Sequence, residues 1–331
     1  MKMFAVLSML IDVQGVHNEL SDAWSSYFRA DHVLNISWPH GVPHLHLPDT
    51  PLMRVAIERL NVVPSEHATL KRFVSIFHAV CRRGATFVDS GANEGFWSLF
   101  AAAHGCTAVA IEPQPYCAQM IRAASIRNGV MSRVQLHTMA FTDDTSGKRP
   151  CVPFDMCKGT ASYTGGKVID IRNQGNSVRE AEKCSTVPLG TLDELLPSST
   201  IDLWHLDVEG AELAALRSAK RLLEEKRILR IIIEVDSMQR WRLNVKGKMR
   251  IDETVAEVRA VFATWTCSSV CDGKPYQLPL HFQWGGPGIC PDMYCVAPGV
   301  HDVDELHNVP FDCSVRSRVV LSDIRTWYVC L

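Results

Sequence analysis

Short apolar runs alternate with helical patterns through the middle of the chain. The predicted strands are residues 86–89, 107–111, 134–139, 201–206 and 228–235, with a later strand near residue 293; the predicted helices are residues 65–82, 97–103, 116–128 and 211–226. Strands that alternate with helices predict right-handed βαβ crossovers and a mostly parallel sheet with helices on both faces. The run at 228–235 is apolar enough to be buried on both faces.

This alternation separates a central domain from the two ends of the chain. We expect an α/β domain over residues 79–300, an N-terminal extension of helical and irregular structure over 1–78, and a C-terminal tail over 301–331. A long polar insert, residues 143–188, lies between the third and fourth predicted strands. The sequence VIDI near residue 168 could add edge strands to the sheet.

The composition excludes several classes of protein. Of the 331 residues, 47% are hydrophobic and 21% charged, which is an ordinary globular balance and excludes disorder of the whole chain. The formal net charge is -2, whereas a protein that grips nucleic acid through its phosphates usually has a basic excess. Nucleic acid is therefore an unlikely partner, and the oligomeric state cannot be predicted.

No apolar run approaches the roughly 20 residues that a membrane span requires. The apolar stretch from Met3 to Ile11 is followed by Asp12 and by no small-residue cleavage site. We interpret it as a buried strand or helix, with a secretory signal as the alternative. The expected location is cytoplasmic.

The cysteines and histidines do not form a regular metal-binding pattern. The chain has 12 cysteines and no C-x-x-C pair. The nearest approaches are two loose clusters: Cys267, Cys271, Cys290 and Cys295, and His40, His44 and His46 in a proline-rich loop. The cysteine gaps are wider and less regular than those of a zinc ribbon. We expect buried free thiols and no metal site.

The sequence VDSGANEGFWS, residues 88–98, joins the first predicted strand to a helix. Gly91 and Gly95 allow a tight turn and a close approach to a ligand, and the following helix points free N–H groups at the same cleft. This pattern is typical of a cofactor loop, but it lacks the third glycine of the dinucleotide fingerprint. A ligand without phosphates, such as S-adenosylmethionine, needs only one tight turn, with Asp89 and Asn93 to hold its amino acid moiety.

Glu112 ends the second predicted strand, 23 residues after Asp89. A carboxylate at this position can accept hydrogen bonds from both hydroxyls of a ribose. An acid there also suits NAD, so an NAD-dependent oxidoreductase stays an alternative, as does a non-catalytic protein that binds S-adenosylmethionine.

A second motif, IDLWHLDVEGAEL at residues 201–213, completes a recognisable order: VDSGANEG, AIEP, TLDELL, IDLWHLDVEGAE and IIIEVD. This order resembles the FkbM family of S-adenosylmethionine-dependent methyltransferases over roughly residues 85–236, with a looser match to the strand around Tyr294. The resemblance implies a Rossmann-like methyltransferase fold with a mostly parallel seven-stranded sheet and an antiparallel last strand. It also implies a methyltransferase that usually methylates a hydroxyl. His205 stands where the family commonly has Lys, and the insert is long.

The likeness also assigns residues to the cofactor site. It implies that the cofactor S-adenosylmethionine is held by the loop and by the acid of the second strand, with the adenine near the end of the third strand: Asp89, Gly91, Asn93, Gly95, Glu112, Met139 and Ala140. The fourth-strand signature corresponds to Asp207, Glu209, Gly210 and Glu212.

Asp207, Glu209 and His205 are the candidate catalytic residues. Methyl transfer is an in-line displacement, so the acceptor must be aligned, and an alcohol needs a base or a metal in contact with it. Asp207 and Glu209 follow the fourth strand at the carboxyl edge of the sheet, where ligands of this fold bind. Their alternative role is N-capping of the next helix. His205 lies one pleat repeat deeper and is either a general base or a core histidine.

The acceptor is expected to be a hydroxyl on a small molecule or glycan. No N/D-P-P-Y/F or Pro-Cys motif, which mark amino-group or cytosine methylation, follows the fourth strand. The basic segment MQRWRLNVKGKMR, residues 238–250, favours an acceptor with negative charge, because Arg can bind a carboxylate or phosphate through two bonds. A solvated basic loop is the alternative.

Overall fold

A seven-stranded sheet forms the centre of the computed structural model. The structure describes residues 33–36, 45–48, 50, 53, 64–81, 84–141, 151–153, 157, 161–164, 167–170, 184–235, 251–270, 273, 275, 292–301, 316–319 and 327–330. The strands are β3 (Thr86–Ser90), β4 (Thr107–Ile111), β5 (Val134–His137), β12 (Leu203–Leu206), β13 (Arg230–Glu234), β14 (Thr266–Ser269) and β15 (Asp292–Val296). Their order is β14-β15-β13-β12-β3-β4-β5, and β15 is antiparallel to both of its neighbours. The predicted fold is confirmed.

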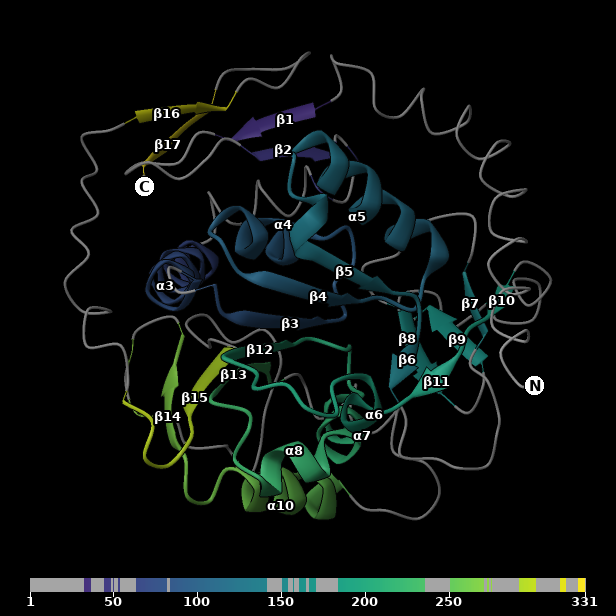
Figure 1. The fold of residues 1–331 in the computed structure, drawn as a ribbon, viewed down its shortest axis with the longest axis vertical. Helices are drawn as coiled ribbons and strands as arrows, with labels where there is room; N and C mark the ends of the chain where they lie inside the picture. Colours follow the sequence, from purple (N-terminus) through teal and green to yellow (C-terminus); the bar gives the residue numbers. More distant parts are fainter. Residues whose placement is uncertain are drawn as a thin grey trace, which may run out of the picture.

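Side chains alternate between two cores, one on each face of the sheet. Phe87 and Ile232 belong to one core, and their chain neighbours Val88 and Ile231 to the other, as the period of two in a strand requires. The first core packs under α3 (Pro64–Cys81), α4 (Phe96–Ala103) and α5 (Pro115–Arg127). The second packs under α6 (Leu192–Leu195), α7 (Glu212–Ser218), α8 (Lys220–Glu224) and α10 (Ile251–Val261), on the opposite side of the sheet (Figure 1).

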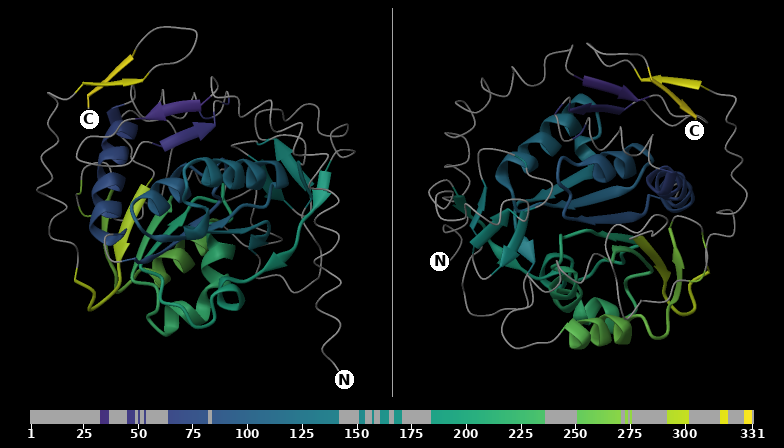
Figure 2. Two further views of the ribbon diagram at one scale, coloured as in Figure 1. Left: turned by 45° about the horizontal axis from the view of Figure 1, so that its top comes forward. Right: turned by 180° about the vertical axis from the view of Figure 1, so that it is seen from behind.

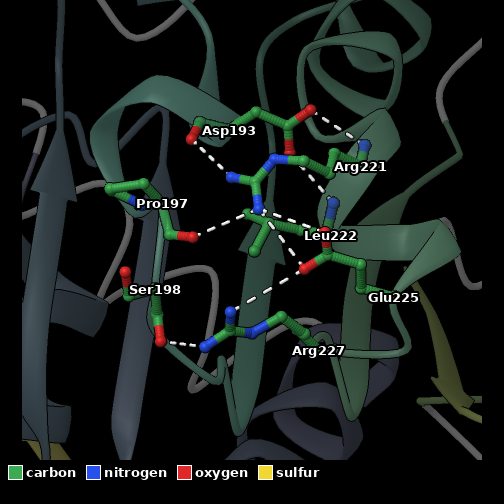
Figure 3. Close-up of polar contacts among 7 residues, drawn as sticks. All are labelled: Asp193, Pro197, Ser198, Arg221, Leu222, Glu225 and Arg227. Atoms are coloured by element: carbon green, nitrogen blue, oxygen red, sulfur yellow. Dashed lines mark hydrogen bonds and ion pairs between the residues drawn. The ribbon is translucent and has the colours of Figure 1, made fainter.

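The single helix predicted over residues 211–226 is wrong in one respect: it is broken at Ala219 into α7 and α8. The carboxylate of Asp193, in α6, accepts hydrogen bonds from the backbone N–H groups of Arg221 (2.8 Å) and Leu222 (3.0 Å), and so caps the start of α8 (Figure 3). The Arg221 guanidinium donates hydrogen bonds to the carbonyl oxygens of Asp193 and Pro197, and the Arg227 guanidinium donates to the carbonyl oxygen of Ser198. Polar contacts from a separate helix therefore stabilise the break.

The predicted N-terminal extension contributes to the core. Strands β1 (Val33–Ile36) and β2 (Leu45–Pro48) form an antiparallel hairpin, and Leu45 and Leu47 are buried in the first core. The side-chain amide of Asn128, after α5, donates to the carbonyl of His46 and accepts from its N–H. The proposed boundary at residue 78 falls inside α3; the division into three parts stays a prediction.

The described parts of the insert form small β-pairs apart from the main sheet. They are β7 (Cys151–Pro153) with β10 (Cys184–Thr186), and β8 (Ala161–Thr164) with β9 (Lys167–Asp170). The VIDI sequence therefore pairs with β8 and not with an edge of the main sheet. A third pair, β6 (Ala140–Phe141) with β11 (Leu189–Gly190), joins the insert to the domain. These pairs gather beyond the end of β5, at the carboxyl edge of the parallel strands (Figures 1 and 2). In the tail, β16 (Arg316–Val319) pairs with β17 (Trp327–Cys330).

The expectation of free thiols is wrong for six cysteines. Within the described residues, disulfides join Cys81 to Cys106, Cys117 to Cys157, and Cys267 to Cys295. The partners are 25 to 40 residues apart in sequence, and the fold brings them together. The last pair, for example, is directly opposed across β14 and β15. Because both sulfurs are in this disulfide, Cys267 and Cys295 are not free thiolates that could bind a metal ion.

Several sequence predictions lie outside the described residues: the apolar stretch at 3–11, His40, His44, Cys271, Cys290 and the basic segment at 238–250. No helix in the described part of the chain is long and apolar enough to cross a membrane. Among the same residues, no three His, Cys, Asp or Glu side chains are grouped so that they could hold a metal ion.

Candidate active site

The backbone amides of the loop after β3 donate hydrogen bonds inside the protein. The N–H groups of Gly91 and Ala92 donate to the carbonyl oxygen of Ile111 (2.9 and 3.1 Å), that of Asn93 to a carboxylate oxygen of Glu112 (2.8 Å), and that of Gly95 to Ala92. A pyrophosphate site needs such amides free to face the ligand. These four amides are therefore not available to a phosphate, so a pyrophosphate could be held only by the first turn of α4, whose internal hydrogen bonds begin at Leu99.

The two loop glycines are required by protein packing. Gly91 has φ +81°, and a Cβ built on it would lie 1.7 Å from the carbonyl oxygen of Asp207. Gly95 has φ +86°, and its Cβ would lie 2.7 Å from Cγ1 of Ile121 in α5. The sequence analysis attributed both glycines to a tight turn and to the close approach of a ligand. In the structure they bring the loop against the end of β12 and against α5.

Glu112 lies at the carboxyl end of β4 and is 3% exposed. One carboxylate oxygen accepts from the N–H of Asn93, and the other from the backbone N–H (2.8 Å) and side-chain amide (3.2 Å) of Gln114. Burial raises the pKa of Glu112 to about 7, against the lowering effect of these hydrogen bonds. A carboxylate has about four lone-pair positions, and three of them are occupied here. The oxygen bonded to Asn93 can therefore accept one further hydrogen bond, and the other can accept a new one only if the side-chain amide of Gln114 moves away.

Asp89 and His205 form a buried pair under the loop. Nδ1 of His205 lies 2.8 Å from one carboxylate oxygen of Asp89, and the hydroxyl of Ser98 donates to the other. The two residues are direct partners across β3 and β12, and the rings of Phe73 and Trp97 contact the imidazole. Burial lowers the pKa of His205, but Asp89, with smaller effects from Asp207 and Asp292, outweighs burial and raises it.

This pair changes the interpretation of both residues. Each carboxylate oxygen of Asp89 is bonded inside the protein, and His205 is 4% exposed in the first core. The geometry is that of a core histidine held by its carboxylate, at a position that steadies the loop and β12 together. Neither a cofactor contact of Asp89 nor a base role of His205 is tested by this geometry, and both stay predictions.

Asp207 and Glu209 follow β12 at the carboxyl edge and are half-buried. The N–H of Asp207 donates to the carbonyl of Ser90, so the residue lies beside the cofactor loop. Its Oδ1 is buried and has no hydrogen-bond partner among the residues that the structure describes. Glu209 adopts φ +55°, an uncommon conformation for a residue with a side chain.

Helix capping does not account for these two acids. The residue before α7 is Ala211, whose side chain makes no capping hydrogen bond, so neither acid holds the N-cap position. Instead Glu212, which is fully buried, accepts from the N–H groups of Val208 (3.3 Å) and Gly210 (3.0 Å) and so holds the turn. Asp207 and Glu209 are thus left at the edge of the sheet, next to the loop.

The predicted adenine position lies on the neighbouring strand end. Met139 packs against Gly190, whose Cβ would lie 2.5 Å from Cε of the methionine, and Ala140 donates to the carbonyl of Pro188. Both Met139 and Ala140 are half-buried. His137, the last residue of β5, accepts the N–H of Glu112 through its carbonyl oxygen, and burial lowers the pKa of its imidazole.

Sequence reasoning missed Glu94, the acid between the two loop glycines. Its carboxylate is buried and accepts the hydroxyl of Thr50 (2.7 Å), while the N–H of Met53 donates to the Thr50 oxygen (2.9 Å). Burial raises the pKa of Glu94 to about 7, opposed by the Thr50 hydroxyl and the Met53 N–H. The signal was a charged residue inside an otherwise small and polar loop, but its partners are more than forty residues away.

The arrangement fits S-adenosylmethionine. Glu112 has one lone-pair position for a ribose hydroxyl and gains a second if the Gln114 side-chain amide moves away. Asn93 and Asp207 are polar groups beside the turn, and Asp207 has one buried oxygen atom without a partner in the described part of the chain. The amides of Gly91, Ala92, Asn93 and Gly95 are bonded inside the protein, so the turn does not present them to a phosphate.

Solved structures with similar chain traces include several methyltransferases. One is the O-methyltransferase TomG from Streptomyces achromogenes in complex with S-adenosylmethionine (12% identity, 85% of this chain and 96% of that chain, TM-score 0.38). Another is an O-methyltransferase from Bacillus cereus in complex with S-adenosylhomocysteine (11% identity, 74% and 87%, TM-score 0.37). The bifunctional kinase-methyltransferase WbdD matches at 15% identity over 76% of this chain and 46% of its own, with a TM-score of 0.38.

No curated protein matches the chain. The family model for the methyltransferase FkbM domain matches residues 89–265, more than half of the chain, from the loop acid Asp89 through the β12 motif to Trp265, directly before β14. The order of the strands and the two motifs at their carboxyl ends agree with this match. The chain therefore belongs to the FkbM family of methyltransferases.

Proposed function

We propose that this methyltransferase binds S-adenosylmethionine at the edge formed by β3, β4 and β12 and transfers the methyl group to a hydroxyl. The observation that carries the proposal is the meeting of the loop with Asp207. Gly91 lies against the Asp207 backbone, and Asn93 donates to Glu112, so one turn connects the ribose acid to the candidate base.

The chain's own residues have separable tasks in this proposal. Glu112 accepts the ribose hydroxyls and fixes the position of the cofactor, which supplies an electrophilic methyl group when bound. Asp207 and Glu209 face the same edge, and one of them takes the proton of the acceptor hydroxyl as the new bond forms. The Asp89–His205 pair keeps the ends of β3 and β12 in register beneath them.

The acceptor class follows from the same chemistry. A carboxylate base beside a sulfonium methyl suits a hydroxyl on a small molecule or a glycan. We retain negative charge on the acceptor as part of the proposal, on the strength of the basic sequence at 238–250. Nucleic acid is disfavoured by the net charge of -2.

The disulfides bear on the compartment. Structural disulfides persist in oxidising surroundings and are rare in the cytosol of most organisms. The described disulfides, Cys81–Cys106, Cys117–Cys157 and Cys267–Cys295, therefore favour an oxidising compartment over the cytoplasmic location expected from the sequence. Mass spectrometry of alkylated protein from its native source tests this proposal, and free thiols at all six positions would contradict it.

The function is tested by calorimetric titration of the purified protein with S-adenosylhomocysteine and, separately, with NAD. Binding of the first and not of the second is expected. A radiolabelled methyl-transfer assay with acidic and neutral hydroxylated acceptors then follows the transfer itself. Binding of NAD alone would overturn the cofactor assignment. Methylation confined to amine or thiol analogues of an acceptor would overturn the hydroxyl.

A further inference from the structure

The disulfide between Cys117 and Cys157 joins the insert to the cofactor loop region. Cys117 is fully buried in the first turn of α5, three residues after Gln114. Cys157 is 40 residues further along the chain, in the insert. The β-pairs of the insert lie at the same carboxyl edge of the sheet as the loop (Figure 1).

The sulfur of Cys157 also touches the loop itself. Its Sγ lies 2.9 Å from Oδ1 of Asn93. Because this sulfur is in a disulfide, it has no proton to donate, so the contact restrains the Asn93 side chain only by its position. Asn93 has φ +51°, a conformation that requires support from its surroundings.

Asn93 connects this contact to the ribose acid. Its backbone N–H donates to Glu112 at 2.8 Å, and Gln114 donates to the other oxygen of the same carboxylate. The chain then returns through Gln114 and α5 to Cys117. The contacts thus form a ring around the proposed ribose site. It runs from the disulfide through Asn93 and Glu112 to Gln114, and back along the chain to Cys117.

We infer that the Cys117–Cys157 disulfide is a positioning element for the cofactor site, which holds Asn93 and Glu112 in the geometry that binds S-adenosylmethionine. The inference rests on the proposed function of that site. The other two described disulfides lie elsewhere: Cys81–Cys106 joins the end of α3 to the start of β4, and Cys267–Cys295 joins β14 to β15. Neither of them contacts the loop residues in any described interaction.

Reduction should therefore loosen the site. A dithiol such as dithiothreitol supplies two electrons and two protons, the S–S bond breaks, two cysteine thiols form, and the reagent is oxidised to its cyclic disulfide. Cys157 is then no longer held beside Asn93. The loop must be ordered when the cofactor binds, and immobilising one or two side chains weakens binding by about threefold to tenfold.

The test is calorimetric titration of the full chain with S-adenosylhomocysteine, before and after reduction, for the wild type and two double variants. We expect the wild type to lose affinity on reduction, and Cys117→Ser/Cys157→Ser to bind weakly under both conditions. The matched control, Cys267→Ser/Cys295→Ser, should bind like the oxidised wild type and still respond to reduction. Circular dichroism melting of each protein separates loss of the site from loss of the fold.

The outcomes are distinct. If the oxidised wild type does not bind the ligand, the proposed function fails. If it binds equally well in both redox states, only the positioning role fails. If the Cys117/Cys157 variant does not fold, alkylation mapping of partly reduced wild type decides the question: affinity must fall in step with the opening of this disulfide. Affinity that follows another disulfide would overturn the inference.

Discussion

Gly91 of the cofactor loop lies directly against the backbone of Asp207 at the end of β12. A Cβ at residue 91 would lie 1.7 Å from the Asp207 carbonyl oxygen and 2.9 Å from its carbonyl carbon, with φ +81° at the glycine. No side chain on residue 91 can be accommodated unless β3 and β12 move apart. The distance between the cofactor loop and the candidate base is therefore set by the backbone.

Gly91→Ala should accordingly destabilise the protein strongly. We expect a loss of about 3–5 kcal/mol in the free energy of unfolding, since an overlap in a packed site adds to the cost of left-handed backbone. Gly299→Ala is the matched control, because Gly299 has the same φ of +81° and no atom within 4 Å of its Cβ position. That variant should lose only about 1–2 kcal/mol in urea denaturation. Equal losses would show that the contact with Asp207 does not matter.

Replacement of Glu112 should weaken cofactor binding. Glu112→Gln puts an amide where two backbone N–H donors and two ribose hydroxyls need acceptors, so we expect a loss of about 1–3 kcal/mol in binding free energy. Titration with S-adenosylhomocysteine at pH 8 measures it. Glu225→Gln, on an exposed helix end, should bind like the wild type; unchanged affinity in Glu112→Gln would remove Glu112 from the site.

Cofactor affinity should also depend on pH through Glu112. Its pKa is raised to about 7, and only the ionised carboxylate accepts from both hydroxyls. Affinity should therefore be constant above pH 8 and fall below pH 7 by up to about tenfold per pH unit. The dependence should be absent in Glu112→Gln and retained in Glu94→Gln. The opposite result in the two variants would assign the titration to Glu94.

Asp207 and Glu209 should matter for transfer more than for binding. We expect Asp207→Asn or Glu209→Gln to lower kcat by about 10²-fold or more, because the proton of the acceptor has no carboxylate to go to. Affinity for S-adenosylhomocysteine should change little. If both variants transfer methyl groups at the wild-type rate, the base lies elsewhere, and His205→Gln becomes the next variant to measure.

The stability of the protein should fall as Glu94 ionises. The pKa of Glu94 is about 7 in the folded chain, against an ordinary value of 4.5 for a glutamate in water. The folded state therefore holds this proton more tightly, and the stabilising effect is complete below pH 4.5 and is lost as pH rises through 7. The loss by pH 8 is up to about 3 kcal/mol.

Glu94→Gln should abolish this particular pH dependence. The variant should melt at a higher temperature than the wild type at pH 8 and show a smaller advantage at pH 5. The control is Glu257→Gln, which removes one partner of the exposed ion pair with Arg217. It should change the melting temperature by the same amount at pH 5 and at pH 8. The prediction would be contradicted if the difference in melting temperature between Glu94→Gln and the wild type were no larger at pH 8 than at pH 5.

Local patterns predicted the sheet and the positions of its strand-end acids. The parallel strands could be predicted from apolar runs such as 107–111 and 228–235, and parallel strands bring their carboxyl ends to one edge. Glu112 and Asp207 therefore had to be near the loop. The strand β14 was missed because its sequence TCSS carries no apolar pattern, and it lies at the edge of the sheet next to β15.

Contacts between distant segments could not be predicted from the sequence. Nothing near Glu94 indicates Thr50, nothing near Ala219 indicates that Asp193 will cap a new helix there, and the spacing of cysteines does not determine their pairing. Asp89 was read as a ligand contact because its position at a strand end suits that role. That role stays a prediction, but the contact of Asp89 with His205 could not be foreseen, because it depends on the register of two strands far apart in the chain.

The position of β15 constrains the order in which the polypeptide can reach its native state during synthesis. This strand inserts between β13 and β14, so the apolar edge of β13 stays unpaired until residues 292–296 have left the ribosome. Leu45 and Leu47, made early, share a core with Tyr294 and Val296, made late. Nascent chains that end before residue 296 thus expose unpaired backbone N–H and C=O groups along β13. Such chains are expected to bind chaperones, and to aggregate if translation stalls there.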